Sequence, residues 1–581
     1  MNSPTQITLH STAHYFLEGL NELGIEYLFC NLGTDHAPLI EEMARWRSEG
    51  RAFAKTILCP HENVAVHMAA GYAIATGRGQ GVLVHVDAGT ANAAMAMHNL
   101  YRGRIPVLLM AGRSPHTLHG ELPGSRDTYV HFVQEPFDQA SIVRPYVKWE
   151  YTLPTGVVAK EALRRAHTLM QSDPKGPVYM MLPRETLAET WDASAIRSYP
   201  EQRFGPVAAG GADPAAVAVL AGRLLAARDP VLVTSYCGRN PASVALLDEL
   251  ARVAGIRVFE FNPLHLNIAH DSPCFAGFMP DESVAKTDCG LLVDIDVPWI
   301  PRDMPDMSDD SSTWWAHIDV DAVKRGFPMW GFPSNLRMEG DSCIILAQLL
   351  DALRARATPA FTARARGRVE ARAAAHRLRL EGVARLAADK GAAGRINPHY
   401  LCAELGRALA PEDVVLNEAI RNGAAVFNQV PRTQPGTRIG LAGGGLGFSG
   451  GMALGMKLAR PGRTVVQVVG DGSFYFCNPE SVLAISSQYR LPIFTLVLDN
   501  GGWAAVKEAT LRMHPDGEAK RLDDYQSQLA RGMAFAKIAE AAGAYGETLT
   551  EPSEVAGAIR RCLDEVRGGR SALLHAHIVP H

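Results

Sequence analysis

The sequence predicts an α/β protein with three successive domains, each built on a doubly wound parallel sheet. Apolar runs alternate with amphipathic helical segments in three sections of the 581-residue chain. Continuous apolar strands that alternate with helices are typical of parallel sheets covered on both faces. The length agrees with this division, because a single hydrophobic core rarely serves more than about 300 residues.

The first domain is expected to span residues 1–193. Amphipathic segments with helical periodicity separate its apolar runs. The strands predicted here are Tyr27–Asn31, Lys55–Cys59, Gly81–Val86 and Ile105–Gly112. A change of composition between Ser194 and Pro214 then marks a linker.

The second domain is expected at residues 205–355 and repeats the same alternation. Its predicted strands are Pro230–Gly238, Ile256–Asn262, Gly290–Val297 and Trp314–Asp321. Residues 356–394 are rich in Arg and Ala with interleaved Glu, which is typical of an exposed connecting helix rather than an RNA-binding segment.

The third domain is expected at residues 395–581. Its predicted strands are Asp413–Asn417, Thr464–Gly470, Pro492–Leu498 and Ser571–Ile578. Three units of about 150 to 190 residues each would be ordinary domain sizes.

The composition excludes several classes of partner. The net charge of -4 gives no electrostatic basis for binding nucleic acid or an anionic membrane surface. No apolar stretch is long enough to cross a bilayer, and the N-terminus lacks the pattern of a signal peptide. The 9 Cys are scattered without paired spacing, so neither a disulfide framework nor a zinc site is indicated. We therefore expect a cytoplasmic protein.

Two predicted strands of the third domain end in small, oxygen-bearing residues. Asp471 stands between Gly470 and Gly472 after one strand, and Asn500 precedes two glycines after the next. Ligands of parallel sheets bind beyond the carboxyl ends of the strands, where a single crossover would place these residues side by side. Carboxylate and amide oxygens suit Mg²⁺, and the glycines let the backbone approach a phosphate group. The pattern predicts a magnesium-bound phosphate site.

This pattern resembles the fingerprint of the thiamin-diphosphate-dependent enzymes, the superfamily of pyruvate decarboxylase and acetolactate synthase. The resemblance covers nearly the whole chain and implies pyrimidine-binding, central and diphosphate-binding domains, in that order. It implies that Asp471, Asn500 and the carbonyl of Gly502 ligate Mg²⁺, which holds the diphosphate. It also implies further cofactor contacts by Asn417, Gly444, Gly445, Leu446, Gly470, Gly472 and Ser473. Leu446 matches the bulky residue over which the cofactor bends.

The family's activating glutamate matches Glu62, which follows a predicted strand and precedes Ala69–Ala73, the motif Ala-Ala-Gly-Tyr-Ala. Without the resemblance, Glu62 would be an ordinary acid at a helix start, stabilised by the helix dipole. With it, Glu62 is expected to share a proton with N1′ of the cofactor's aminopyrimidine and so to activate the cofactor.

Several stretches are similar to the benzoylformate decarboxylases, among them Val84–Leu100 and Arg144–Tyr151. This similarity implies a proton-transfer role for His85 and a substrate contact by Thr34. His36 and Trp503 are also expected to face the substrate. Asn92 and Asn417-Glu418 are expected to help to build the pocket.

The chain also departs from the benzoylformate decarboxylase pattern. The stretch DVPWIPRDMPDM of the central domain has no match to their second active-site histidine, and Ala419-Ile420-Arg421 replaces small hydroxyl residues. The segment His119–Gln139 is longer and, through Val133-Gln134-Glu135, partly matches the Phe-Gln-Glu pattern of acetolactate synthases. No clear glycine fingerprint for a flavin is present.

The resemblance implies a carbon–carbon lyase that decarboxylates a 2-oxo acid and has carboligase ability. The alternatives are an acetolactate-synthase-type transferase that condenses two oxo acids, and a non-catalytic paralogue that binds the cofactor. Small 2-oxo acids or aldehydes are the expected substrates. The family architecture implies a homodimer or homotetramer with active sites at subunit interfaces.

Overall fold

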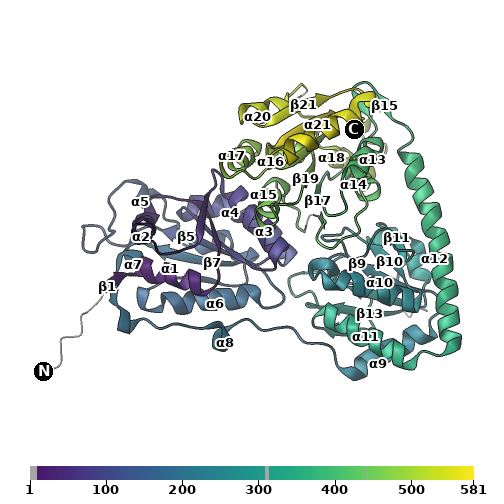
Figure 1. Ribbon diagram of the computed structural model, residues 1–581, viewed down its shortest axis with the longest axis horizontal. Helices are drawn as coiled ribbons and strands as arrows, with labels where there is room; N and C mark the ends of the chain where they lie inside the picture. Colours follow the sequence, from purple (N-terminus) through teal and green to yellow (C-terminus); the bar gives the residue numbers. More distant parts are fainter. Residues whose placement is uncertain (1–8, 308–312, 441, 531, 581) are drawn as a thin grey trace. The chain divides into compact units, whose positions relative to one another are not determined.

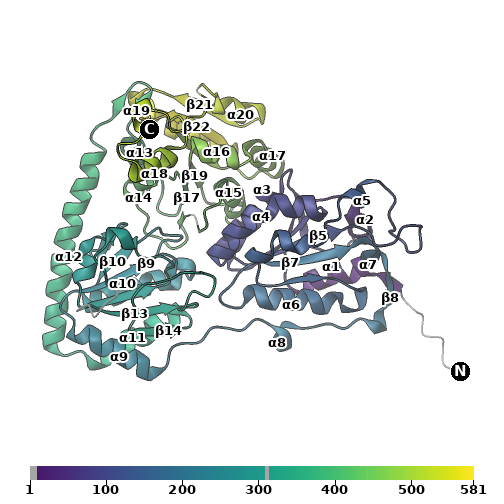
Figure 2. The same ribbon diagram turned by 180° about the vertical axis from the view of Figure 1, so that it is seen from behind.

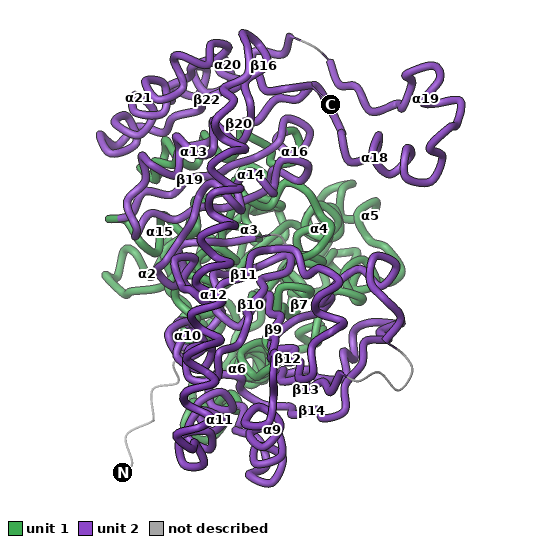
Figure 3. The backbone as a smooth tube through the Cα atoms, turned by 90° about the vertical axis from the view of Figure 1, so that its right-hand side faces the viewer, with its two compact units in different colours: residues 1–208, 442–462, 475–493 green, residues 209–441, 463–474, 494–581 purple. Residues whose placement is uncertain are grey.

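The computed structural model describes residues 9–307, 313–440, 442–530 and 532–580, and the chain divides into two compact units (Figure 3). Unit 1 comprises residues 1–208, 442–462 and 475–493. Unit 2 comprises residues 209–441, 463–474 and 494–581. Each unit is described separately below. None of the helices in the described ranges has both the length and the apolar character needed to span a membrane.

Unit 1 contains a six-stranded parallel sheet with the order β3-β2-β4-β5-β7-β6. Helices α1 and α6 cover one face and α3 and α4 the other, as two opposite views show (Figures 1 and 2). The strands are β2 (Tyr27–Asn31), β3 (Lys55–Leu58), β4 (Gln80–Val84), β5 (Val107–Arg113), β6 (Glu150–Thr152) and β7 (Val178–Pro183). The helices are α1 (Thr12–Glu22), α2 (Ala37–Ser48), α3 (Glu62–Thr76), α4 (Val86–Gly103), α5 (Val130–Val133) and α6 (Ala159–Gln171).

Helix α3 packs against α15 (Ser449–Ala459) of the same unit with their backbones in contact. A Cβ added at Gly71 would lie 2.1 Å from the carbonyl oxygen of Met452, and one at Gly455 would lie 2.0 Å from that of Met68. Only glycine permits this approach. The N-terminus of α3 is capped by His61, whose side chain accepts a hydrogen bond from the Asn63 amide. The helix ends at Gly77, whose φ is 75°.

Unit 2 contains two further six-stranded parallel sheets. One has the order β11-β10-β9-β12-β13-β14 and the other β18-β17-β19-β20-β22-β21. The first consists of β9 (Pro230–Thr234), β10 (Arg257–Glu260), β11 (Phe275–Gly277), β12 (Cys289–Val293), β13 (Trp314–Asp319) and β14 (Leu336–Glu339). The second consists of β17 (Val414–Glu418), β18 (Arg438–Ile439), β19 (Val465–Gly470), β20 (Phe494–Asp499), β21 (Tyr545–Leu549) and β22 (Ala572–His577).

A long helix, α12 (Pro359–Leu386), connects these two sheets in the sequence (Figure 1). Most of its residues are exposed or half-buried. The helix lies within the segment 356–394 that was expected to connect the domains, and the limits of that segment remain a prediction. Three residues of its inner side, Phe361, Ala365 and His376, are buried.

The three parallel sheets confirm the predicted fold class. Most expected strands are present with ends shifted by a few residues, and β4 stops at Val84, so that His85 caps α4 instead of ending the strand. The expected linker contains a short helix, α8 (Glu201–Phe204). Short strands at the sheet edges were not predicted, and neither was an antiparallel pair of β1 (Leu9–Ser11) with β8 (Thr190–Asp192). The domain limits at 193, 205, 355 and 395 remain predictions.

Candidate active site

The three predicted metal ligands converge at the carboxyl ends of β19 and β20. Asp471 follows β19, and these parallel strands pair so that Gly470 lies opposite Leu498. The amide oxygen of Asn500 faces two other oxygens, at 3.2 Å from Asp471 Oδ1 and 2.9 Å from the carbonyl oxygen of Gly502. Such separations match neighbouring corners of an octahedron with metal–oxygen bonds of about 2.0–2.1 Å. Without a cation, rotation of the amide would replace the repulsion by two hydrogen bonds.

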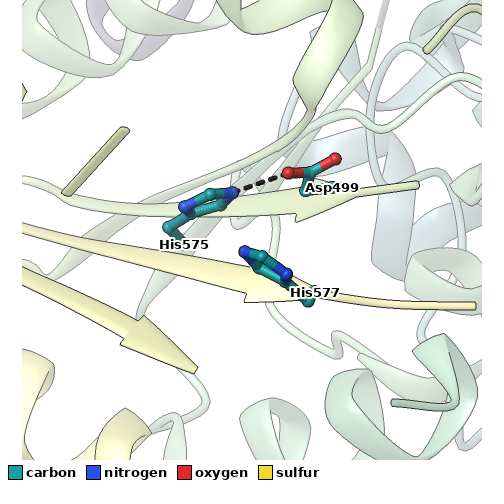
Figure 4. A group of neighbouring side chains, drawn as sticks. All are labelled: Asp499, His575 and His577. Atoms are coloured by element: carbon teal, nitrogen blue, oxygen red, sulfur yellow. Dashed lines mark hydrogen bonds and ion pairs between the residues drawn. The ribbon is translucent and has the colours of Figure 1, made fainter. Parts of the chain in front are cut away.

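A second acidic side chain lies beside this site. Asp499 ends β20 and accepts a hydrogen bond from His575 on the adjacent β22, Oδ2 to Nε2 at 2.8 Å, with His577 nearby (Figure 4). Burial would raise the pKa of Asp499, but the hydrogen bond and charge of His575 lower it. Burial and then the charge of Asp499 raise the pKa of Asp471 to about 7. Two facing carboxylates in a buried site favour a bound cation.

The donor set and the backbone around it fit a metal-bound diphosphate. A Cβ at Gly470 or Gly501 would meet nothing within 4 Å, so both strand ends leave open space. Gly501 and Gly502 have φ of 88° and 148°, conformations that side-chain-bearing residues rarely adopt. The residues present therefore fit both Mg²⁺ and the phosphate groups that it would hold.

The neighbouring predicted contacts take different positions in unit 2. Ser473 is buried within α16 (Asp471–Phe476), and Asn417 is buried near the end of β17, where its side chain accepts from the Ala419 amide. Trp503 packs over Gly472, whose Cβ would lie 2.4 Å from the indole ring. Trp503 as a whole is 39% exposed, and its predicted contact with the substrate remains a prediction.

The glycine-rich stretch from Gly440 includes Leu441, which lies outside the described residues. Residues 442–448 lead into α15 and belong, like that helix, to unit 1. Asn99 of α4 holds the Gly445 peptide on both sides: it donates to the carbonyl at 2.9 Å and accepts from the amide at 3.1 Å. Leu446 next to it is half-buried. The backbone next to Leu446 is therefore held in place by Asn99, and the predicted cofactor contact of Leu446 remains a prediction.

Glu62 is the first residue of α3 and is nearly buried. Asn92 of α4 donates to its Oε2 at 3.1 Å. A Cβ at Gly89 would lie 3.4 Å from Oε1, so the carboxylate packs closely against the start of α4. Glu62 and Asn92, both singled out from the sequence, are thus brought together.

The first-domain residues expected at the substrate gather after β2 and β4. These strands pair with Asn31 opposite Val84, so the residues that follow them meet. His85 Nδ1 hydrogen-bonds Asp35, and its Nε2 lies 2.9 Å from Gln134 Oε1. Thr34 Oγ1 lies 3.3 Å from His131 Nε2. His36 is fully buried behind Asp35, and its predicted contact with the substrate remains a prediction.

Sequence analysis missed Asp35, the contact of Gln134 with His85, and the pair Asp499–His575. A signal for Asp35 was present in the sequence, because Asp35 stands between Thr34 and His36, which were both expected to contact the substrate. What was lacking was the order of the strands in the sheet, which brings Asp35 to His85.

Comparison with known proteins identifies two domains. Residues 10–142 match the N-terminal TPP binding domain of thiamine pyrophosphate enzymes, and residues 423–576 match the C-terminal TPP binding domain. The chain is 26% identical to a benzoylformate decarboxylase from Pseudomonas aeruginosa, with 96% of each chain covered. It is 24% identical to the acetolactate synthase large subunit of Haemophilus influenzae, over 94% of this chain and 91% of that one.

Solved structures share the fold. A 4-hydroxybenzoylformate decarboxylase from Rhodococcus jostii superposes with a TM-score of 0.76 at 20% identity, covering 98% of this chain and all of that one. A putative thiamin diphosphate-dependent enzyme from Mycobacterium smegmatis gives the same TM-score at 21% identity, covering 99% and 100%. Fold and domains together define a thiamin-diphosphate-dependent enzyme. Within that class, the chain belongs to the family of the decarboxylases and acetolactate synthases.

Proposed function

We propose that the protein is a thiamin-diphosphate- and Mg²⁺-dependent decarboxylase of 2-oxo acids, similar to benzoylformate decarboxylase and with carboligase ability. The observation that carries this proposal is His85, a histidine whose two ring nitrogens hydrogen-bond to Asp35 and Gln134. The similarity to a benzoylformate decarboxylase over 96% of the chain supports the choice.

Different residues of the chain are assigned to cofactor binding and to proton transfer. Asp471, Asn500 and the Gly502 carbonyl would hold Mg²⁺, and the open glycine backbone would admit the diphosphate. Thiamin diphosphate, when bound, supplies a nucleophilic carbon and an electron sink for C–C cleavage. Glu62 holds a proton at the pyrimidine, oriented by Asn92. His85 delivers the proton that the substrate carbon needs for release of an aldehyde.

Product analysis tests this function. The purified protein, supplied with thiamin diphosphate and Mg²⁺, is incubated separately with an aryl glyoxylate and with pyruvate. We expect CO₂ and free aldehyde, and His85→Asn should lower aldehyde release more than cofactor binding. Release of neither CO₂ nor aldehyde from a panel of 2-oxo acids would contradict the proposal.

A second candidate is an acetolactate-synthase-type transferase. The observation that favours it is Gln134, part of the segment that partly matches the acetolactate synthase pattern, because its side chain contacts His85. The acetolactate synthases among the relatives agree with it. Acetolactate formed from pyruvate, in place of free acetaldehyde, would establish this reaction instead.

A further inference from the structure

His85 is held between two hydrogen-bond acceptors. Its Nδ1 bonds Oδ1 of Asp35, and its Nε2 lies 2.9 Å from Oε1 of Gln134. An ionised carboxylate and an amide oxygen can only accept, and both ring nitrogens of histidine donate only when the ring is protonated. With the Gln134 amide in the orientation of this structure, the contacts are those of an imidazolium.

We propose that Asp35 is a positioning residue that, with Gln134, keeps His85 doubly protonated and aligned. The reason for keeping His85 protonated rests on the proposed function, in which His85 is the proton donor. The ion pair itself rests only on the contacts within unit 1.

Two glycines leave the space that this pair occupies. A Cβ at Gly112 would lie 1.3 Å from Oδ2 of Asp35, and a Cβ at Gly33 would lie 1.9 Å from Nδ1 of His85. Asp35 is only 1% exposed, whereas the His85 side chain is 21% exposed. The Asp35 carboxylate is thus shielded from water, whereas the His85 ring remains accessible to water.

Asp35 also faces a second histidine, which is neutral. The Gly33 amide donates to Nδ1 of His36 at 3.0 Å, so this ring carries its proton on Nε2, which lies 3.2 Å from Oδ2 of Asp35. Burial lowers the pKa of His36. The buried carboxylate therefore has one charged partner, His85, and the group is neutral as a whole.

The surrounding charges agree with this assignment. The hydrogen bond to Asp35 raises the pKa of His85 against the effect of burial, and Asp87 of α4 adds to it. Burial alone would raise the pKa of Asp35, but the hydrogen bond from His85 lowers it, and the charge of His85 adds to that effect. His131 of α5, the other titratable ring near Asp35, has its pKa lowered by burial.

The backbone after His85 is strained. Val86 has φ of 20°, a conformation that β-branched residues rarely adopt, at the first residue of α4. Strain of this kind persists when surrounding contacts over-determine a residue, and it is frequent at functional sites.

The proton balance is simple. The Nε2–H bond of His85 breaks, and the electron pair left on the substrate carbon by C–C cleavage takes the proton to form a C–H bond. The Nδ1 proton stays on the ring, hydrogen-bonded to Asp35. The neutral ring regains a proton from water through its exposed edge, and the hydroxide that is left combines with the released CO₂ to form bicarbonate.

The test is a pH titration of His85 in the full-length protein with ¹³Cε1-labelled histidine, with and without thiamin diphosphate. The His85 signal is assigned by its loss in His85→Asn. We expect Asp35→Asn to move the titration midpoint of His85 to lower pH, while Asp87→Asn, which removes the same charge without touching the ring, moves it much less. An unchanged midpoint in folded Asp35→Asn would overturn the proposal.

Gln134→Leu provides a second variant in case Asp35→Asn fails to fold. Loss of an accepting amide oxygen should also lower the titration midpoint of His85, and an unchanged or raised midpoint would contradict a protonated ring.

In active protein, Asp35→Asn should move the alkaline limb of the kcat/KM profile to lower pH, with roughly a 10- to 10²-fold loss of kcat/KM on that limb. The titration needs no turnover, so failure of the proposed decarboxylation would appear only in the product assay.

Discussion

Glu62 combines a helix start with a near-buried carboxylate. The helix dipole stabilises an acid there, and Asn92 orients it. These contacts are also compatible with a purely structural acid, so a substitution that keeps the shape is needed to separate the two roles.

We predict that Glu62→Gln lowers kcat by roughly 10² to 10⁴, the scale of a lost acid–base group. The amide keeps the side chain's size, so the thermal midpoint should change little. Steady-state kinetics with saturating cofactor provide the measurement. Turnover equal to that of the parent protein would rule out the activation role and leave Glu62 as a structural acid.

The metal site gives a second prediction at this scale. Asp471→Ala removes one of three converging oxygens and should abolish Mg²⁺-dependent retention of thiamin diphosphate. Cofactor remaining after gel filtration, with and without Mg²⁺, is the quantity to measure. The exposed Asp516→Ala serves as the control for loss of a carboxylate. If the Asp471 variant keeps its cofactor tightly, the metal lies elsewhere.

Helices and strands were predictable from the sequence where a local pattern determines them. The apolar run before Asp471 and the glycines after Asn500 identified β19 and β20 and their ends. Sheet order has no local signal, and so the meeting of Asp35 with His85 and of Asp499 with His575 was not foreseen. The early end of β4 was missed because Val86 resumes the apolar pattern after His85, although the backbone already turns into α4 there.

The crossing of α3 and α15 allows a test at the scale of elements. Gly71→Ala would place a methyl group against the Met452 carbonyl and should lower the free energy of unfolding by about 1–3 kcal/mol. The control is Gly367→Ala in the exposed part of α12, where a Cβ meets nothing and about 0.5–1 kcal/mol should be gained. Thermal or urea unfolding compares them. Equal stability of both variants would show that the crossing can relax.

At the scale of the whole molecule, the family architecture predicts that a glutamate from one subunit serves the cofactor held by another. Mixing inactive Glu62→Gln and Asp471→Ala proteins, with subunit exchange, should then restore up to about a quarter of the parent activity, because mixed dimers contain one intact site. Sedimentation measures the assembly in parallel. No recovery despite proven exchange would contradict shared sites.

The close crossing of α3 and α15 at Gly71 and Gly455 also fixes the segments next to these helices. One of its helices starts with Glu62, and the other follows directly after the Leu446 loop. Asn63 adds a bridge to this loop, since its amide lies 3.4 Å from the Gly447 carbonyl oxygen. The crossing therefore holds the start of α3, with Glu62, and the loop that carries Leu446 at a fixed separation within unit 1, so that a substitution that loosens the crossing would move both.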